Sequence, residues 1–98
     1  MATNELQFLA TLESVIVDRL GNPSQSSYTA SLAALGPKRV AQKVGEEAVE
    51  LALASVAGDR AEVLEESADL VYHLLVLLNS HDIRLSDVVD VLNARHTG

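Results

Sequence analysis

The chain has 98 residues, of which 48% are hydrophobic and only three are aromatic, and it contains no cysteine. This length suits one domain over 1–98 with an aliphatic core, and the lack of cysteine excludes disulfides and thiolate sites. The formal net charge of −7 excludes the basic patch that nucleic acids and anionic membranes require, so we expect neither as a partner.

The N-terminal third of the chain predicts a long helix, a loop and a short helix. Apolar residues recur every three or four positions over 4–20, with Thr3 as the expected N-cap and Gly21 as the expected end. The segment 21–27 is rich in turn-forming residues and predicts a loop. A short helix is expected to follow over 28–35.

Two longer helices follow, joined by a very short connection. A proline opens the first of them, over 37–57, and a glycine ends it. Asp59 with Glu62 forms a capping pair for the second, over 60–79. The second half of 60–79 is apolar on nearly all sides, so it should lie at the centre of the assembly.

The C-terminal segment predicts a last helix over 87–95, with Ser86 as its N-cap. No part of the chain has the alternating pattern of a strand. We therefore expect an all-α bundle of four to five helices. A chain this short with so many aliphatic residues is expected to bury some of them against a second copy, so that dimerisation completes the bundle.

The first residues, MATNELQF, lack the basic and apolar segments of a signal peptide. The longest apolar stretch, 70–78, is interrupted by His73 and is too short to span a bilayer. From these two observations we expect a soluble, cytoplasmic protein.

Two acidic pairs lie on the two long helices. Glu47 and Glu50 are three positions apart on one helix, and Glu66 and Asp69 are three apart on the next, so each pair shares a face. The short connection favours an antiparallel hairpin, in which the pairs lie at equal distances of about eight and eleven residues from the turn. The four carboxylates should therefore meet as two levels, one helical turn apart.

Four facing carboxylates would raise one another's pKa and oppose folding unless a cation lay between them. A single pair of this kind is usually a solvated acidic surface, but two mirrored pairs favour a metal site. Carboxylate oxygens favour Mg²⁺, with Mn²⁺ as the alternative, and the lack of cysteine argues against Zn²⁺. The predicted metal ligands are Glu47, Glu50, Glu66 and Asp69.

The neighbouring residues leave alternatives open. Glu46 is either an ordinary exposed residue or a group that orients the attacking water. Lys43 is either an i,i+4 ion-pair partner or a ligand of a phosphate, and Lys38 and Arg39 add positive charge nearby. Gly45, costly inside a helix, indicates either close helix packing or room for a substrate.

The junction at Ser27, Tyr28 and Thr29 has two interpretations of equal weight. These residues either cap and pack the short helix, or contact a substrate where free backbone N–H groups favour phosphate. His73 lies one turn beyond Asp69, and a buried, hydrogen-bonded core histidine is favoured there over a metal ligand.

The segments KVGEEAVELALA (43–54) and EESADLVYHLLVLL (65–78) closely resemble the phosphoribosyl-ATP pyrophosphohydrolases of histidine biosynthesis. That family belongs to the all-α nucleotide pyrophosphohydrolases, with MazG and the dimeric dUTPases. The superfamily signature, E-E-x-x-E followed by E-x-x-D, is matched by Glu46, Glu47, Glu50, Glu66 and Asp69. The segments NPSQSSYTASL (22–32) and LSDVVDVLNARH (85–96) favour the histidine branch.

The resemblance implies Mg²⁺-dependent hydrolysis of 1-(5-phosphoribosyl)-ATP to 1-(5-phosphoribosyl)-AMP and pyrophosphate, by an enzyme that is at least dimeric and has a MazG-like fold. The five signature residues would be catalytic, Lys43 with Lys38 or Arg39 would neutralise phosphate charge, and Tyr28 and Thr29 would contact the substrate. The next enzyme, phosphoribosyl-AMP cyclohydrolase, is expected as a separate chain.

Two other functions compete with this one. A house-cleaning pyrophosphohydrolase of the MazG or dimeric dUTPase type would share the fold and the metal site but act on free nucleotides. A non-catalytic helical interaction module would bind no Mg²⁺ and hydrolyse no triphosphate.

Overall fold

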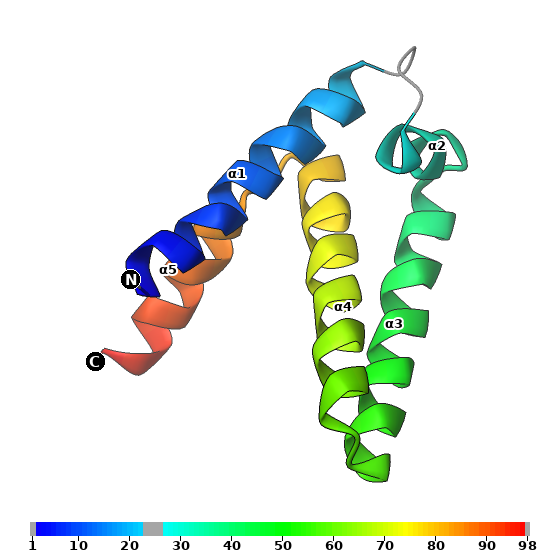
Figure 1. Ribbon diagram of the computed structural model, residues 1–98. Coiled ribbons are helices and arrows are strands. Elements are labelled where there is room, and N and C mark those ends of the chain that lie inside the picture. The colour runs from blue at the N-terminus through cyan, green and yellow to red at the C-terminus, as the bar shows by residue number, and fades with distance from the viewer. Residues whose placement is uncertain (1, 23–26, 98) are drawn as a thin grey trace.

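The computed structural model describes residues 2–22 and 27–97, and these residues form five helices and no strand. The helices are α1 (Ala2–Gly21), α2 (Tyr28–Ala34), α3 (Pro37–Ala57), α4 (Arg60–Ser80) and α5 (Leu85–His96). Figure 1 shows two arms: α3 and α4 run antiparallel in one, α1 and α5 lie in the other, and α2 sits above α3. The predicted all-α class is confirmed.

The turn of the α3–α4 hairpin consists of two residues, of which the first ends α3 and the second caps the start of α4. Gly58 adopts φ +78°, and its N–H donates to the carbonyl groups of Ala54 and Ser55, which ends α3. Asp59 then caps α4 through Oδ1, which accepts from the N–H of Ala61 at 3.0 Å and of Glu62 at 3.3 Å. Both boundaries agree with the prediction from sequence.

The core lies where α4 meets the other helices. The buried apolar cluster draws on four helices and consists of Ile16, Leu32, Val40, Leu75 and Val76. The second half of α4 contributes two of these residues, which confirms its predicted central place. Among the described residues, no helix is long and apolar enough to cross a membrane.

Two predicted helix starts are wrong. Helix α1 begins at Ala2, so Thr3 lies inside its first turn and is not the N-cap. Helix α5 begins at Leu85, so Ser86 lies in its first turn. Of the predicted loop over 21–27, residues 23–26 lie outside the described part of the chain, and residue 21 is the last residue of α1.

Helix α5 starts early because other groups satisfy its first N–H groups. The Asp87 carboxylate accepts from the backbone N–H of Arg84 at 2.9 Å, and Glu13 of α1 accepts from the N–H of Leu85 at 2.8 Å. With these acceptors in place, the helix needs no hydroxyl cap at Ser86.

Candidate active site and metal centre

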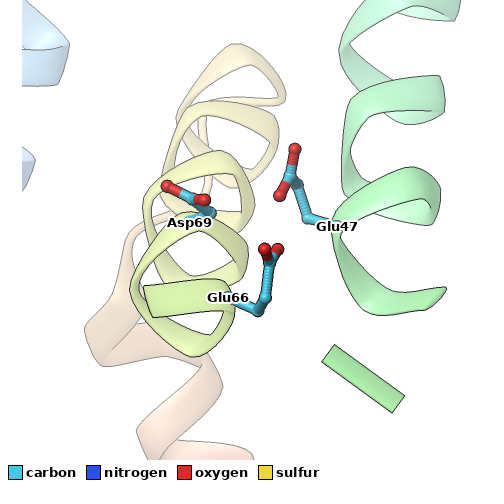
Figure 2. A group of neighbouring side chains, drawn as sticks. All are labelled: Glu47, Glu66 and Asp69. Carbon is cyan, nitrogen blue, oxygen red and sulfur yellow. The ribbon is translucent and has the colours of Figure 1, made fainter. Parts of the chain in front are cut away.

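The predicted acidic residues of α3 and α4 converge across the hairpin. Glu47 of α3 and Glu66 and Asp69 of α4 each offer one carboxylate oxygen, and these oxygens lie within 4.8 Å of one another. Figure 2 shows the three carboxylates gathered at the space between the two helices. The equal spacing of the acidic pairs from the turn explains why these residues meet.

The carboxylates of the cluster have unsatisfied oxygens. Glu47 is only 6% exposed, and Oε2 of Glu47 and Oε2 of Glu66 are buried without a hydrogen-bond partner in the described structure. A buried acceptor with no partner costs free energy, and more so when it is charged. Two such oxygens in one cluster are therefore suited to a cation.

Glu50, the fourth predicted ligand, is exposed and lies outside the group of three. It still reaches the cluster, since a hydrogen bond with Glu50, together with burial and the nearby charges of Glu50, Glu47 and Asp69, raises the pKa of Glu66 to about 7. Glu66 therefore takes up a proton far more readily than an ordinary glutamate.

The donor set fits a hard divalent ion. Within the described residues, the cluster offers carboxylate oxygens alone, and the two buried unpartnered oxygens face no competing protein donor. Oxygen-only sets suit Mg²⁺ and Mn²⁺. The residues present therefore fit the predicted type of ion.

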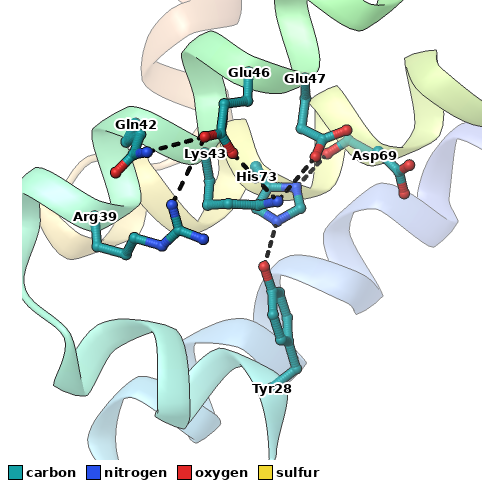
Figure 3. A network of polar contacts seen from close by, with 8 residues as sticks. All are labelled: Tyr28, Arg39, Gln42, Lys43, Glu46, Glu47, Asp69 and His73. Carbon is teal, nitrogen blue, oxygen red and sulfur yellow. Dashed lines mark hydrogen bonds and ion pairs between the residues drawn. The ribbon is translucent and has the colours of Figure 1, made fainter.

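A band of polar contacts runs along α3 beside the cluster (Figure 3). Lys43 Nζ lies 3.2 Å from Glu47 Oε1 and 3.7 Å from Glu46 Oε1. Glu46 Oε2 accepts from Gln42 Nε2 at 2.9 Å and lies 3.8 Å from the Arg39 guanidinium. Hydrogen bonding to Glu47 raises the pKa of Lys43 above its usual value, so Lys43 is a cation at neutral pH.

The other two predicted features of α3 lie toward solvent. Lys38 is exposed in the first turn of the helix, and the described residues give it no ion pair. A methyl group built on Gly45 would meet nothing within 4 Å, so close packing against another helix of the same chain does not explain this glycine. Gly45 instead lines an open groove of about 510 Å³.

His73 is a core residue, as the sequence favoured. It is buried, and its Nδ1 lies 2.7 Å from the backbone carbonyl oxygen of Asp69. Because a carbonyl oxygen only accepts, Nδ1 carries a proton, and in the neutral ring Nε2 accepts from the Tyr28 hydroxyl at 2.9 Å. This bond ties α2 to α4 beside the carboxylate cluster.

The residues of the α2 junction have protein partners. Ser27 caps α2 by accepting from the N–H of Ala30 at 3.0 Å. Thr29 is buried and its hydroxyl bonds to the hydroxyl of Tyr72, which supports the packing alternative for Thr29. Tyr28 is 52% exposed, so part of its ring remains open to a ligand.

Sequence reasoning missed Tyr72 and Gln42. The rings of Tyr28, Tyr72 and His73 form one cluster with centroid separations of 5.2–6.1 Å. The chain has only three aromatic residues, so a tyrosine next to a histidine on an apolar helix is unusual in it. That pair was the sequence feature that could have indicated a ring cluster. Gln42 lies one turn before Glu46, a spacing that predicts contact.

Comparison with known proteins identifies matches over nearly the whole chain. The family model described as "Phosphoribosyl-ATP pyrophosphohydrolase" matches residues 9–96. Proteins named "Histidine biosynthesis bifunctional protein HisIE" are also similar. The one from Photobacterium profundum is 57% identical over 91 residues, which are 93% of this chain and 44% of that protein.

The same name belongs to a protein of Pasteurella multocida, 57% identical over 92% of this chain and 45% of its own length. The Salmonella typhimurium protein is 50% identical over 97% of this chain and 47% of its own length. The chain thus spans just under half the length of these curated relatives.

Proposed function

The chain belongs to the phosphoribosyl-ATP pyrophosphohydrolase family, and we propose that it catalyses the hydrolysis of 1-(5-phosphoribosyl)-ATP to 1-(5-phosphoribosyl)-AMP and pyrophosphate. This is a step of histidine biosynthesis, the pathway in the names of the similar proteins. Release of pyrophosphate breaks the anhydride between the α- and β-phosphoryl groups of the triphosphate.

The observation that carries this proposal is the carboxylate cluster on the α3–α4 hairpin. Its members Glu47, Glu66 and Asp69 belong to the signature of the superfamily, lie within 4.8 Å of one another and include two buried oxygens without partners. In an ordinary solvated acidic surface, carboxylate oxygens are hydrogen bonded to water or to protein donors and are not buried without a partner.

We propose that Glu47, Glu50, Glu66 and Asp69 hold Mg²⁺, with Mn²⁺ as the alternative ion. When bound, the ion would neutralise charge on the triphosphate and polarise the reacting phosphoryl group. A chain of net charge −7 is then able to bind a polyanion, because the cation lies between the two.

The remaining roles fall to side chains around the cluster. Lys43 and Arg39, which lie along the same face of α3, bind phosphate oxygens, and exposed Lys38 adds positive charge. The open side of the Tyr28 ring contacts the substrate. Thr29 bonds to the hydroxyl of Tyr72, whose ring contacts that of Tyr28, so Thr29 helps to position the Tyr28 ring.

We further propose that the enzyme is a cytoplasmic homodimer. The apolar side chains that this chain leaves exposed on α3 are the support for a second copy. That phosphoribosyl-AMP cyclohydrolase is a separate chain stays a prediction, since the similar proteins are named bifunctional and match this chain over less than half of their length.

The first test is the substitution Glu47→Gln. It preserves the shape of a buried side chain and removes one ligand charge, so pyrophosphate release should fall by about 100-fold or more, as for loss of a group that acts on the transition state. The exposed Glu5→Gln on α1 is the matched control and should retain full activity. Near-normal turnover of Glu47→Gln would contradict the site.

The second test separates the histidine enzyme from its relatives. Pyrophosphate release should be fastest from 1-(5-phosphoribosyl)-ATP in a panel that includes ATP, dUTP and dCTP. The gene should also restore growth of a histidine auxotroph that lacks this step. A preference for a free deoxynucleotide would assign the chain to the house-cleaning class, and no hydrolysis of any triphosphate would favour an interaction module.

A further inference from the structure

We propose that Glu46 is a positioning residue, which holds Lys43 and Arg39 as a pair of cations for the phosphate chain of the substrate, and that it is not part of the metal shell. This inference rests on the proposed function. It assigns to the first glutamate of the signature a role different from that of its neighbour Glu47.

The two adjacent glutamates project from different faces of α3. Successive residues of an α-helix are about 100° apart, so only one of them is able to face α4. Glu47 does so and is 6% exposed. The side chain of Glu46 is 42% exposed and does not belong to the group of converging carboxylates.

Glu46 is instead occupied on both oxygens by residues of the preceding turns. Oε1 faces Lys43 at 3.7 Å, and Oε2 faces Arg39 at 3.8 Å and accepts from Gln42 at 2.9 Å (Figure 3). The Gln42 amide is an uncharged donor that bonds at an ordinary length and holds the carboxylate in place. The two cations then gather around a fixed anion.

The ion pairs of Glu46 orient the two cations without saturating them. Charge-assisted hydrogen bonds are usually about 2.7–2.9 Å long, and both distances to Glu46 are close to 1 Å longer. Lys43 has three N–H donors and Arg39 has five, so each retains donors for phosphate oxygens. Long side chains lose rotamer freedom when they bind, and Glu46 removes part of that cost in advance.

Lys43 connects this group to the carboxylate cluster. Its Nζ lies between Glu46 and Glu47, 3.7 Å from one and 3.2 Å from the other. A phosphate chain that reaches the cluster through the proposed metal ion would therefore pass beside Lys43. Arg39 lies one turn before Lys43, toward the start of α3.

The test uses binding of inorganic pyrophosphate in the presence of Mg²⁺, measured by calorimetry on the full chain. If Glu46 acted only through its charge, Glu46→Gln would strengthen anion binding. A positioning role has the opposite sign, and we expect pyrophosphate to bind about five- to tenfold more weakly, the effect of losing one oriented charged contact. The control Glu5→Gln removes the same charge from α1, a helix of the other arm (Figure 1), and should change the affinity less than about twofold.

A double-mutant cycle tests whether Glu46 acts through the two cations. In a chain that carries Lys43→Met and Arg39→Met, adding Glu46→Gln should leave pyrophosphate affinity unchanged. The proposal would be overturned if Glu46→Gln still lowered pyrophosphate affinity about five- to tenfold in the chain without the two cations. It would also be overturned if the single variant Glu46→Gln bound pyrophosphate as tightly as the wild type or more tightly, or if the wild-type chain did not bind pyrophosphate.

Mn²⁺ binding without nucleotide, followed by electron paramagnetic resonance, tests the second part. Glu46→Gln should bind Mn²⁺ within about twofold of wild type, whereas Glu47→Gln should bind it at least about tenfold more weakly. Equal losses in both variants would place Glu46 in the metal shell. None of these measurements needs turnover, so they remain valid if the proposed substrate is wrong. Binding of Mn²⁺ by Glu46→Gln at wild-type affinity would also show that this variant is folded.

Discussion

At the scale of single residues, the site is governed by the cost of placing carboxylates together. Glu66 has a pKa of about 7 because it hydrogen bonds to Glu50 and stands among other acidic groups. Glu47 escapes part of this cost through its ion pair with Lys43 at 3.2 Å. The metal-free site is therefore a strained arrangement that either a proton or a cation relieves.

This strain predicts how stability depends on pH. The unfolded chain has Glu66 at its ordinary pKa of 4.5, and the folded chain raises the pKa to about 7, so the folded state binds more protons between these values. The contribution of Glu66 is fully present below pH 4.5 and is lost as the pH rises through 7. Denaturant unfolding in EDTA should thus show the wild type losing stability between pH 5 and pH 8.

The variant Glu66→Gln isolates this effect from other titrating groups. It should lose less stability than the wild type over the same pH interval, since its amide does not titrate. The proposed Mg²⁺ would compete with the proton, so the rise in Tm on adding Mg²⁺ to the wild type should be larger at pH 8 than at pH 6. Parallel pH profiles for the two proteins would refute the raised pKa of Glu66.

The sequence predicted that Glu47, Glu66 and Asp69 meet. It also offered the i,i+4 ion pair of Lys43 with Glu47 as one alternative, which the structure shows. It did not predict the contacts that Glu46 makes. Glu47 and Asp69 are equidistant from a two-residue turn, so helical geometry alone brings them level. The direction of Glu46 depends on which face of α3 packs on α4. That face is decided by buried residues such as Val40 and Ala54, and reading the helical periodicity of α3 more closely would have found it.

At the scale of elements, the α3–α4 hairpin depends on its turn. Gly58 has φ +78°, and a methyl group there would meet nothing within 4 Å, so a substitution costs only backbone strain. Gly58→Ala should lower the free energy of unfolding by about 1 kcal/mol. Gly58→Asn should cost less, because asparagine tolerates this conformation better. Equal losses for alanine and asparagine in denaturant titrations would contradict a conformational cause.

Glu13 joins three helices through one carboxylate. Its Oε2 accepts from Asn79 Nδ2 of α4 at 3.1 Å and from the N–H of Leu85 of α5 at 2.8 Å. Glu13→Ala leaves both donors without this partner and should lower the free energy of unfolding by about 1–3 kcal/mol. Glu13→Gln keeps an acceptor oxygen and should lose less, and the exposed Glu5→Ala should be nearly neutral. A neutral Glu13→Ala would show that water replaces the carboxylate at no cost.

Glu13 also explains why the start of α5 was predicted two residues too late. Sequence patterns find caps a few positions from a helix end, as at Asp59. The acceptor for Leu85 comes from α1, 72 positions away, and no local pattern contains it. The ends of α3 were predictable because Pro37, at its first position, and Gly58 act locally.

At the scale of the whole molecule, the chain exposes more surface than a compact monomer of its mass. Its accessible surface is 6793 Å², whereas about 5,400 Å² is expected for 10.5 kDa. Its radius of gyration of 14.7 Å likewise exceeds the roughly 12.6 Å of a compact domain. The excess of about 1,400 Å² per chain matches what an obligate homodimer buries.

The apolar part of this excess includes the outer face of α3. Val49, Leu53 and Val56 follow one another at i, i+4 and i+7 and are 59%, 65% and 87% exposed, on the side of the helix away from α4. Gly45 continues the same face, and its lack of a side chain would let a second helix approach closely. In the proposed dimer, the close-packing interpretation of this glycine would apply between copies, since it does not apply within one chain.

Substituting Leu53 with aspartate tests this surface. A second copy on α3 would bury the new carboxylate without a partner, so Leu53→Asp should convert the proposed dimer to a monomer in sedimentation velocity experiments at micromolar concentration. Ser55→Asp adds the same charge to an exposed position on a different face of α3 and should leave the dimer intact. A wild-type chain that sediments as a monomer would refute the dimer itself. Dimers of both variants would instead assign the contact to the apolar groove between α1 and α5, lined by Leu6, Leu9 and Val89.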